Sequence, residues 1–187
     1  MKKIISCVIL AIFAATTNAQ SKLPPLDQSP MDMSYCPADY PILRIQGKDK
    51  EPLVARIIYG RPQKNGRIIF GDLVPYGSVW RLGANEATEI EFFKDIKLSG
   101  KKVAKGRYTL YALPQADKWT LILNTETNIW GAFKYDSKKD VLRTDVPVQN
   151  QTDSTDIFTM IFEKNNSTSA NLLISWENVF VKMPFNW

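Results

Sequence analysis

Short apolar runs separated by turn residues fill the chain from Leu53 to the C-terminus, and this pattern constrains the fold more than any other feature. Such runs are typical of β-strands, and the helical period of 3.6 residues is scarce. Many short strands at regular spacing indicate an antiparallel arrangement. We therefore predict an all-β chain: a single antiparallel β-sandwich or jelly-roll-like domain over residues 53–187.

Turn signals and alternation define the individual strands. Ser99-Gly100 predicts one hairpin turn, and a second hairpin is expected to join Gly106–Leu113 to Trp119–Asn124. Residues 87–93 alternate between two faces, as a half-buried strand does. Further strands are expected at Leu53–Tyr59, Val141–Val148, Ile157–Glu163, Asn171–Trp176 and Val179–Met183.

The first 19 residues have the pattern of a secretory signal peptide. Lys2 and Lys3 precede the apolar run Ile4–Ala15, and Thr17–Ala19 offers small residues for cleavage before Gln20. The apolar run is shorter than the ~20 residues that a membrane-spanning helix needs. We therefore expect export to the periplasm or the extracellular space, with no membrane span after signal cleavage.

Residues 20–52 are predicted to form an extended N-terminal arm that packs against the domain. Prolines resist both regular helix and central strand. This segment contains Pro24, Pro25, Pro30, Pro37, Pro41 and Pro52.

Composition excludes several function classes. The chain has no histidine, which removes Ser-His triads and the usual zinc and copper sites. Cys36 is the only cysteine after the signal, so no internal disulfide is possible there and a buried or unpaired thiol is expected. The net charge of +5 is not clustered, so no nucleic-acid partner is expected. No loop has the dense Asp/Asn/Gly spacing of a calcium site, and we expect neither a metal nor a cofactor.

The segment from Ile58 to Ile90 gathers charged and aromatic side chains among turn residues. Arg61 and Arg81 each carry a planar guanidinium that suits carboxylates, phosphates or sugar hydroxyls. Trp80 precedes Arg81, so the pair could offer a stacking wall with a donor. Alternatively, Arg81 could pair internally with Glu86 or Asp72 and hold the loop together.

Small residues and carboxylates follow in the same segment. Gly83-Ala84 permits close approach of the backbone, either to a ligand or to another strand. Asn85 is a candidate ligand-binding residue. Glu86 is the best candidate acid or base, with Asp72 or Glu89 as a second carboxylate, because paired carboxylates can hydrolyse glycosides. Glu89 and Glu91 alternate on a predicted strand and are expected on its solvated face.

Aromatic residues further along the chain extend the candidate set. Trp130 and Tyr135 lie in a loop-like stretch and are candidate ligand-binding residues, since apolar sugar faces stack on aromatic rings. Arg143 is a further candidate donor for the same face. Trp119 and Trp176 lie on predicted strands, where large aromatic side chains usually belong to the core.

Several strings in a fixed order resemble one known family. They are YGRPQKNGRIIFGDLVPYGSVWRLGANEATEI, GKKVAKGRYTLYALP, WTLILN, IWGAFKYD and DVLR. Together they are similar to the secreted bacterial family of domain of unknown function 2911, typical of Bacteroidetes, over about Asp32–Glu163. The resemblance implies an exported β-rich protein and carries no activity.

Three hypotheses for function remain open at this stage. The first is a non-catalytic binding or cell-envelope-associated module, whose partner is a carbohydrate, another small polar ligand or an envelope protein. The second is a carbohydrate-active hydrolase that uses Glu86 with Asp72 or Glu89. The third is a purely structural protein in which residues 83–88 lock the arm to the sheet.

Overall fold

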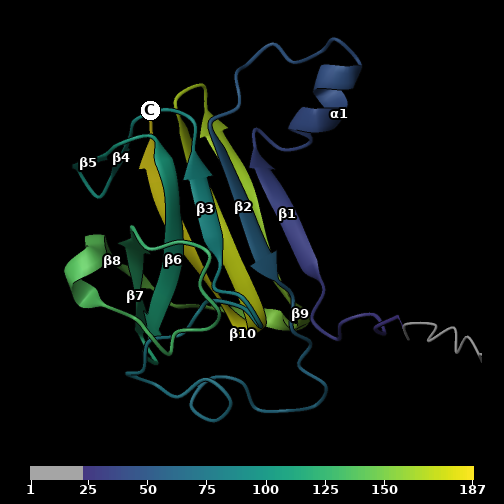
Figure 1. Ribbon diagram of the computed structural model, residues 1–187, viewed down its shortest axis with the longest axis vertical. Coiled ribbons are helices and arrows are strands. Elements are labelled where there is room, and N and C mark those ends of the chain that lie inside the picture. The colour runs from purple at the N-terminus through teal and green to yellow at the C-terminus, as the bar shows by residue number, and fades with distance from the viewer. Residues whose placement is uncertain (1–22) are drawn as a thin grey trace, which may run out of the picture.

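The computed structural model describes residues 23–187, which form two antiparallel β-sheets packed face to face (Figure 1). This arrangement confirms the predicted β-sandwich. The predicted signal peptide lies outside the described residues. Within residues 23–187, no helix is long and apolar enough to cross a membrane.

The larger sheet has six strands in the order β1-β2-β3-β6-β7-β8, and every neighbouring pair is antiparallel. Its strands are β1 (Met31–Cys36), β2 (Ala55–Gly60), β3 (Glu89–Phe92), β6 (Gly106–Pro114), β7 (Lys118–Asn124) and β8 (Asp140–Pro147).

The smaller sheet has four strands in the order β5-β4-β10-β9. Its strands are β4 (Ile96–Leu98), β5 (Lys101–Val103), β9 (Gln149–Asn166) and β10 (Ser169–Asn186). A six-residue helix, α1 (Tyr40–Ile45), and a short 3-10 helix, η1 (Ser137–Lys139), complete the elements that the structure describes.

Local sequence signals located the hairpins correctly. Leu98 pairs with Lys101 around the predicted Ser99-Gly100 turn, and β6 pairs with β7 as expected. In β3, Ile90 and Phe92 are buried whereas Glu89 and Glu91, which alternate with them, are partly exposed, and this confirms the predicted alternation.

The C-terminal hairpin is longer than the sequence pattern predicted. Each of β9 and β10 runs for 18 residues, and β10 joins the two strands expected on either side of Glu177. The pairing register shifts between Ser175 and Val179, and Glu177 has a φ of 55°. A bulge therefore absorbs the irregular residues without ending the strand.

The predicted arm contributes an edge strand and a helix to the fold. β1 pairs along its whole length with β2, at the edge of the larger sheet where a Pro-rich segment is tolerated. Pro41 lies in the first turn of α1, where its missing N–H costs no helical hydrogen bond. At the end of β1, Cys36 is free and buried, as expected, and burial raises the pKa of its thiol to about 11.

A cluster of large aromatic side chains fills the core between the sheets. Trp119 comes from β7, Trp176 from β10 and Phe158 from β9. Trp80 comes from the long connection between β2 and β3, stacks on Trp176 with ring centroids 6.0 Å apart, and is only 8% exposed. Trp80 therefore anchors this connection, which crosses one end of the sandwich in Figure 1, to the core.

We expect Trp80→Ala to lower the free energy of unfolding by about 3–5 kcal/mol, because it removes the packing of a large buried side chain and leaves a cavity. Trp130→Ala is the matched control, since Trp130 is 61% exposed and should cost no more than about 0.5 kcal/mol. Urea denaturation of both variants measures the difference. Equal losses would contradict the anchoring role of Trp80.

Candidate functional site

A cleft of about 310 Å³ lies against the β2–β3 connection. Three parts of the chain line it: Gln28 and Ser29 before β1, residues 62–85 of the connection, and Trp176 of β10. Arg67 and Arg81 are among the lining residues, and no aspartate or glutamate from residues 23–187 lines the cleft. The cleft is therefore both polar and positively charged.

The backbone around Trp80 fixes the wall of the cleft that contains Arg81. The Trp80 N–H donates to the carbonyl of Ala112 at 2.7 Å, and the Ala112 N–H donates back at 3.0 Å. The indole Nε1 donates to the carbonyl of Gly83 at 3.2 Å. Because these bonds tie residues 80–83 to β6 and to one another, Arg81 has a rigid support.

Gly83 and Ala84 bring this wall into backbone contact with β2. A Cβ atom on Gly60, the last residue of β2, would lie 2.4 Å from the Ala84 carbonyl oxygen. A Cβ on Gly83 would lie 2.9 Å from the Gly60 carbonyl oxygen, and Gly83 has a φ of 153°. Gly83 and Ala84 therefore allow the backbone to lie close to β2, and both residues also line the cleft.

Arg81 has no counter-ion among residues 23–187. No ion pair or side-chain hydrogen bond joins its guanidinium to any residue in 23–187, including Glu86 and Asp72. Its Nε is buried without a partner, and its two terminal nitrogens are not buried in this way. Burial lowers the pKa of Arg81. The internal ion pair considered from the sequence is therefore not formed.

Glu86 and Arg81 line different hollows. Asn85 lines the cleft and has a φ of 60°, and the next residue, Glu86, lines a separate hollow of about 160 Å³ together with Glu89. The Gly131 N–H donates to the Asn85 carbonyl at 3.0 Å, and Glu86 bridges to Trp130, so the loop after β7 holds this reversal. Asn85 and Glu86 therefore line different hollows, although they are adjacent in the chain.

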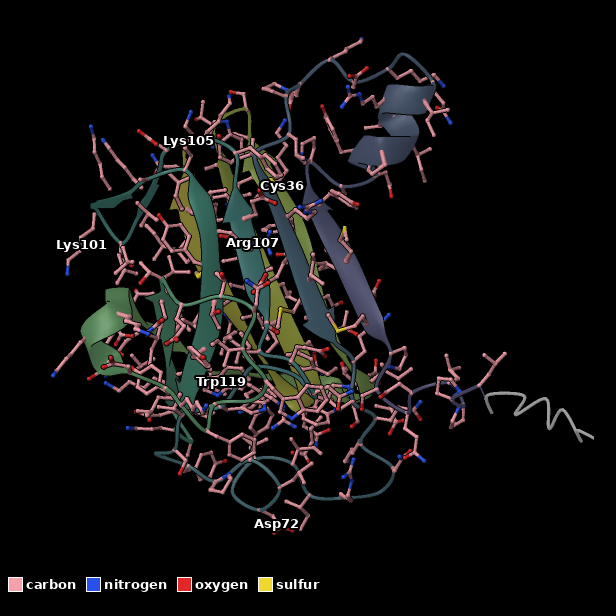
Figure 2. All side chains as sticks on the ribbon, viewed as in Figure 1. Cys36, Asp72, Lys101, Lys105, Arg107 and Trp119 are labelled. Carbon is pink, nitrogen blue, oxygen red and sulfur yellow. The ribbon has the colours of Figure 1, made fainter. Side chains whose placement is uncertain are left out.

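Of the two candidate carboxylate pairs, Glu86 and Asp72 share no hollow, whereas Glu86 and Glu89 line the same one. Asp72 is exposed at the outer edge of the β2–β3 connection and lines neither hollow (Figure 2). Glu89 shares the smaller hollow with Glu86, but its carboxylate accepts from Arg107 at 3.1 Å and from the Asn128 N–H at 2.5 Å. The Glu89 carboxylate therefore has two hydrogen-bond donors within the fold.

Arg61 joins the two sheets outside the lining of the cleft. Its guanidinium donates to Asp32 at 2.8 Å, to the carbonyl of Phe158 at 3.1 Å and to the hydroxyl of Thr159 at 2.9 Å. These bonds connect the ends of β1 and β2 to β9. Three partners give Arg61 a structural role that sequence reasoning did not distinguish from binding.

Tyr135 and Arg143 form a separate network with Asp140. The Tyr135 hydroxyl donates to Asp140 at 2.6 Å, and the Arg143 Nε donates to the same carboxylate at 2.8 Å. Burial and then the Asp140 carboxylate raise the pKa of Tyr135 to about 12. Neither residue lines the cleft, nor does the exposed Trp130. The structure therefore does not bring these three candidates to Arg81.

Five polar residues of the cleft were missing from the sequence-based candidates: Gln28, Ser29, Gln63, Asn65 and Arg67. Asn65-Gly66 is a dipeptide typical of tight turns. Arg67, which donates from Nε to the Lys64 carbonyl at 3.0 Å, follows that turn directly. The density of polar residues around the turn was a usable signal, whereas the approach of Gln28 and Ser29 depends on the path of the chain before β1.

Together, the fold and the cleft define a β-sandwich protein with a positively charged hollow beside a long inter-strand connection. The chain belongs to the family described as "Protein of unknown function (DUF2911)", which matches residues 45–185. The match confirms the family resemblance, but it begins later than the expected Asp32 and extends past Glu163 through most of β10. No match to the chain was found among curated proteins or among solved structures.

Substitution of the two arginines by methionine should separate the binding role from the structural one. Arg81→Met should leave the free energy of unfolding unchanged or raise it, because it removes a partly buried charge that has no partner. Arg61→Met should lower it by about 1–3 kcal/mol, because three partly buried acceptors lose their donor. Urea denaturation measures both. A loss in Arg81→Met as large as that in Arg61→Met would show that Arg81 has a structural partner.

Proposed function

We propose that this protein is an exported, non-catalytic binding module that holds a small polar ligand, such as a carbohydrate, in the cleft around Arg81. The observation that carries the proposal is the guanidinium of Arg81, which borders a hollow of about 310 Å³ and has no partner in the described part of the chain. That volume is near the lower end of the range for small-molecule sites, roughly 300–1,000 Å³. The cleft is preformed, since Trp80 fixes its wall to the core.

Export is part of the proposal and rests on the N-terminal sequence. Residues 1–19 combine two lysines, an apolar run and a small-residue cleavage site, as secretory signals do. Export would place the binding module in the periplasm or outside the cell, where a small ligand or an envelope component would be its partner. An exported protein whose Cys36 is unpaired depends on its core for stability, and the aromatic cluster between the sheets supplies such a core.

The placement of the carboxylates favours binding over glycoside hydrolysis. A hydrolase needs two carboxyl groups that flank one scissile bond, roughly 5–9.5 Å apart. Glu86 and Asp72 share no hollow, and Glu89 is held by Arg107 and Asn128. The cleft around Arg81 is lined by no carboxylate from the described residues. A catalytic carboxylate pair acting in this cleft would therefore have to come from residues that do not line it.

A calorimetric screen of the purified protein against neutral sugars, acidic sugars and amino acids tests the proposal. At least one class should bind, and Arg81→Met should weaken that binding. Arg44→Met, the same change on the distant helix α1, should leave it unchanged. Glu86→Gln should also bind normally, and the ligand should be recovered intact. The absence of binding by every class would contradict the proposed function, as would turnover that Glu86→Gln abolishes.

A further inference from the structure

Resting on the proposed function, we propose that the ligand is an anion: a hydroxylated molecule of monosaccharide size whose single carboxylate or phosphate group pairs with Arg81. Uncharged sugars and acidic sugars could both enter a polar cleft of this volume. The charges, the free amides and the dimensions of the cleft together favour the acidic class.

The charge balance of the cleft calls for an anion. Arg81 and Arg67 line it, and no acidic residue among 23–187 does. Glu177, which follows the lining residue Trp176 on β10, is engaged elsewhere: it forms an ion pair with Lys64 at 3.7 Å and accepts from the Ile69 and Phe70 N–H groups at 3.3 and 3.4 Å. The positive charge of the cleft is therefore not neutralised from within the described chain.

Arg81 is the position at which the anion would be held. The two terminal nitrogens of its guanidinium are not buried in the way that Nε is, and they have no acceptor among residues 23–187, so they are the donors that an anion in the cleft can reach. A guanidinium presents parallel N–H groups that match two oxygens of a carboxylate or a phosphate. An uncharged hydroxyl would satisfy the geometry of one donor but would leave the charge unpaired.

Side-chain amides around Arg81 would recognise hydroxyl groups on the rest of the ligand. Gln28, Gln63, Asn65 and Asn85 all line the cleft, and no hydrogen bond from their side chains to another described residue is formed. An amide both donates and accepts, which suits a hydroxyl better than a second anionic group. These four amides therefore favour a polyhydroxylated molecule with one charge over an inorganic polyanion.

The wall of the cleft limits the size of the ligand. Its volume of about 310 Å³ suits a single sugar ring rather than a polymer segment. Trp80 and Trp176 line one side, and their indole groups are held by the core and by hydrogen bonds to the carbonyls of Gly83 and Asp156. Because Trp80 is 8% exposed and Trp176 only 1%, this side would offer the ring a small apolar surface.

Calorimetric titrations with matched sets of sugars test the inference on the purified protein. Each set contains a hexose, its uronate and its 6-phosphate, with glucose, galactose and mannose as the three parents. In at least one set, the uronate or the phosphate should bind roughly 10- to 100-fold more tightly than the parent hexose. Whether the uronate or the phosphate binds more tightly identifies which anionic group the cleft takes.

Two variants show whether Arg81 is the cause. Arg81→Met should remove the preference for the anion, and Arg44→Met should retain it, while equal unfolding midpoints show that each variant is folded. If a hexose binds as tightly as its anionic derivatives, or if Arg81→Met keeps the preference, the anionic inference is wrong and the binding function stands. If no sugar, acidic sugar or amino acid binds at all, the proposed function is wrong as well.

Discussion

The insertion of Trp80 between the two sheets is the interaction on which the site depends. The residue belongs to a connection of nearly thirty residues that has no helix or long strand of its own. Stacking on Trp176 and paired hydrogen bonds with Ala112 fix its position. Because Arg81 is the next residue, the core determines where its guanidinium lies.

Arg61 and Arg81 lie in the same segment but differ in whether the fold supplies partners for a partly buried charge. Arg61 bonds Asp32, Phe158 and Thr159, so its charge and its donors are accounted for by the fold. Arg81 has no such partners among the described residues, yet the wall that carries it is rigid. A buried polar group without a partner lowers the stability of a fold.

Local patterns in the sequence predicted the sandwich, the two hairpins and the alternating faces of β3, because turn residues and a period of two are local properties. They also located the polar segment that contains the cleft. They could not predict that Asn85 and Glu86 face different hollows, because that reversal depends on hydrogen bonds to the distant loop around Gly131. Arg61 and Arg81 looked equivalent for the same reason, since their partners are remote in sequence.

Nuclear magnetic resonance of the arginine Nε–H groups tests the central claim most directly. Substitution by methionine assigns the signal of Arg81, and the Arg61 Nε–H, which donates to the Phe158 carbonyl, provides an internal reference. On addition of an acidic sugar that binds, the account predicts that the Arg81 signal moves and the Arg61 signal does not. An Arg81 signal that stays in place while the sugar binds would contradict the account.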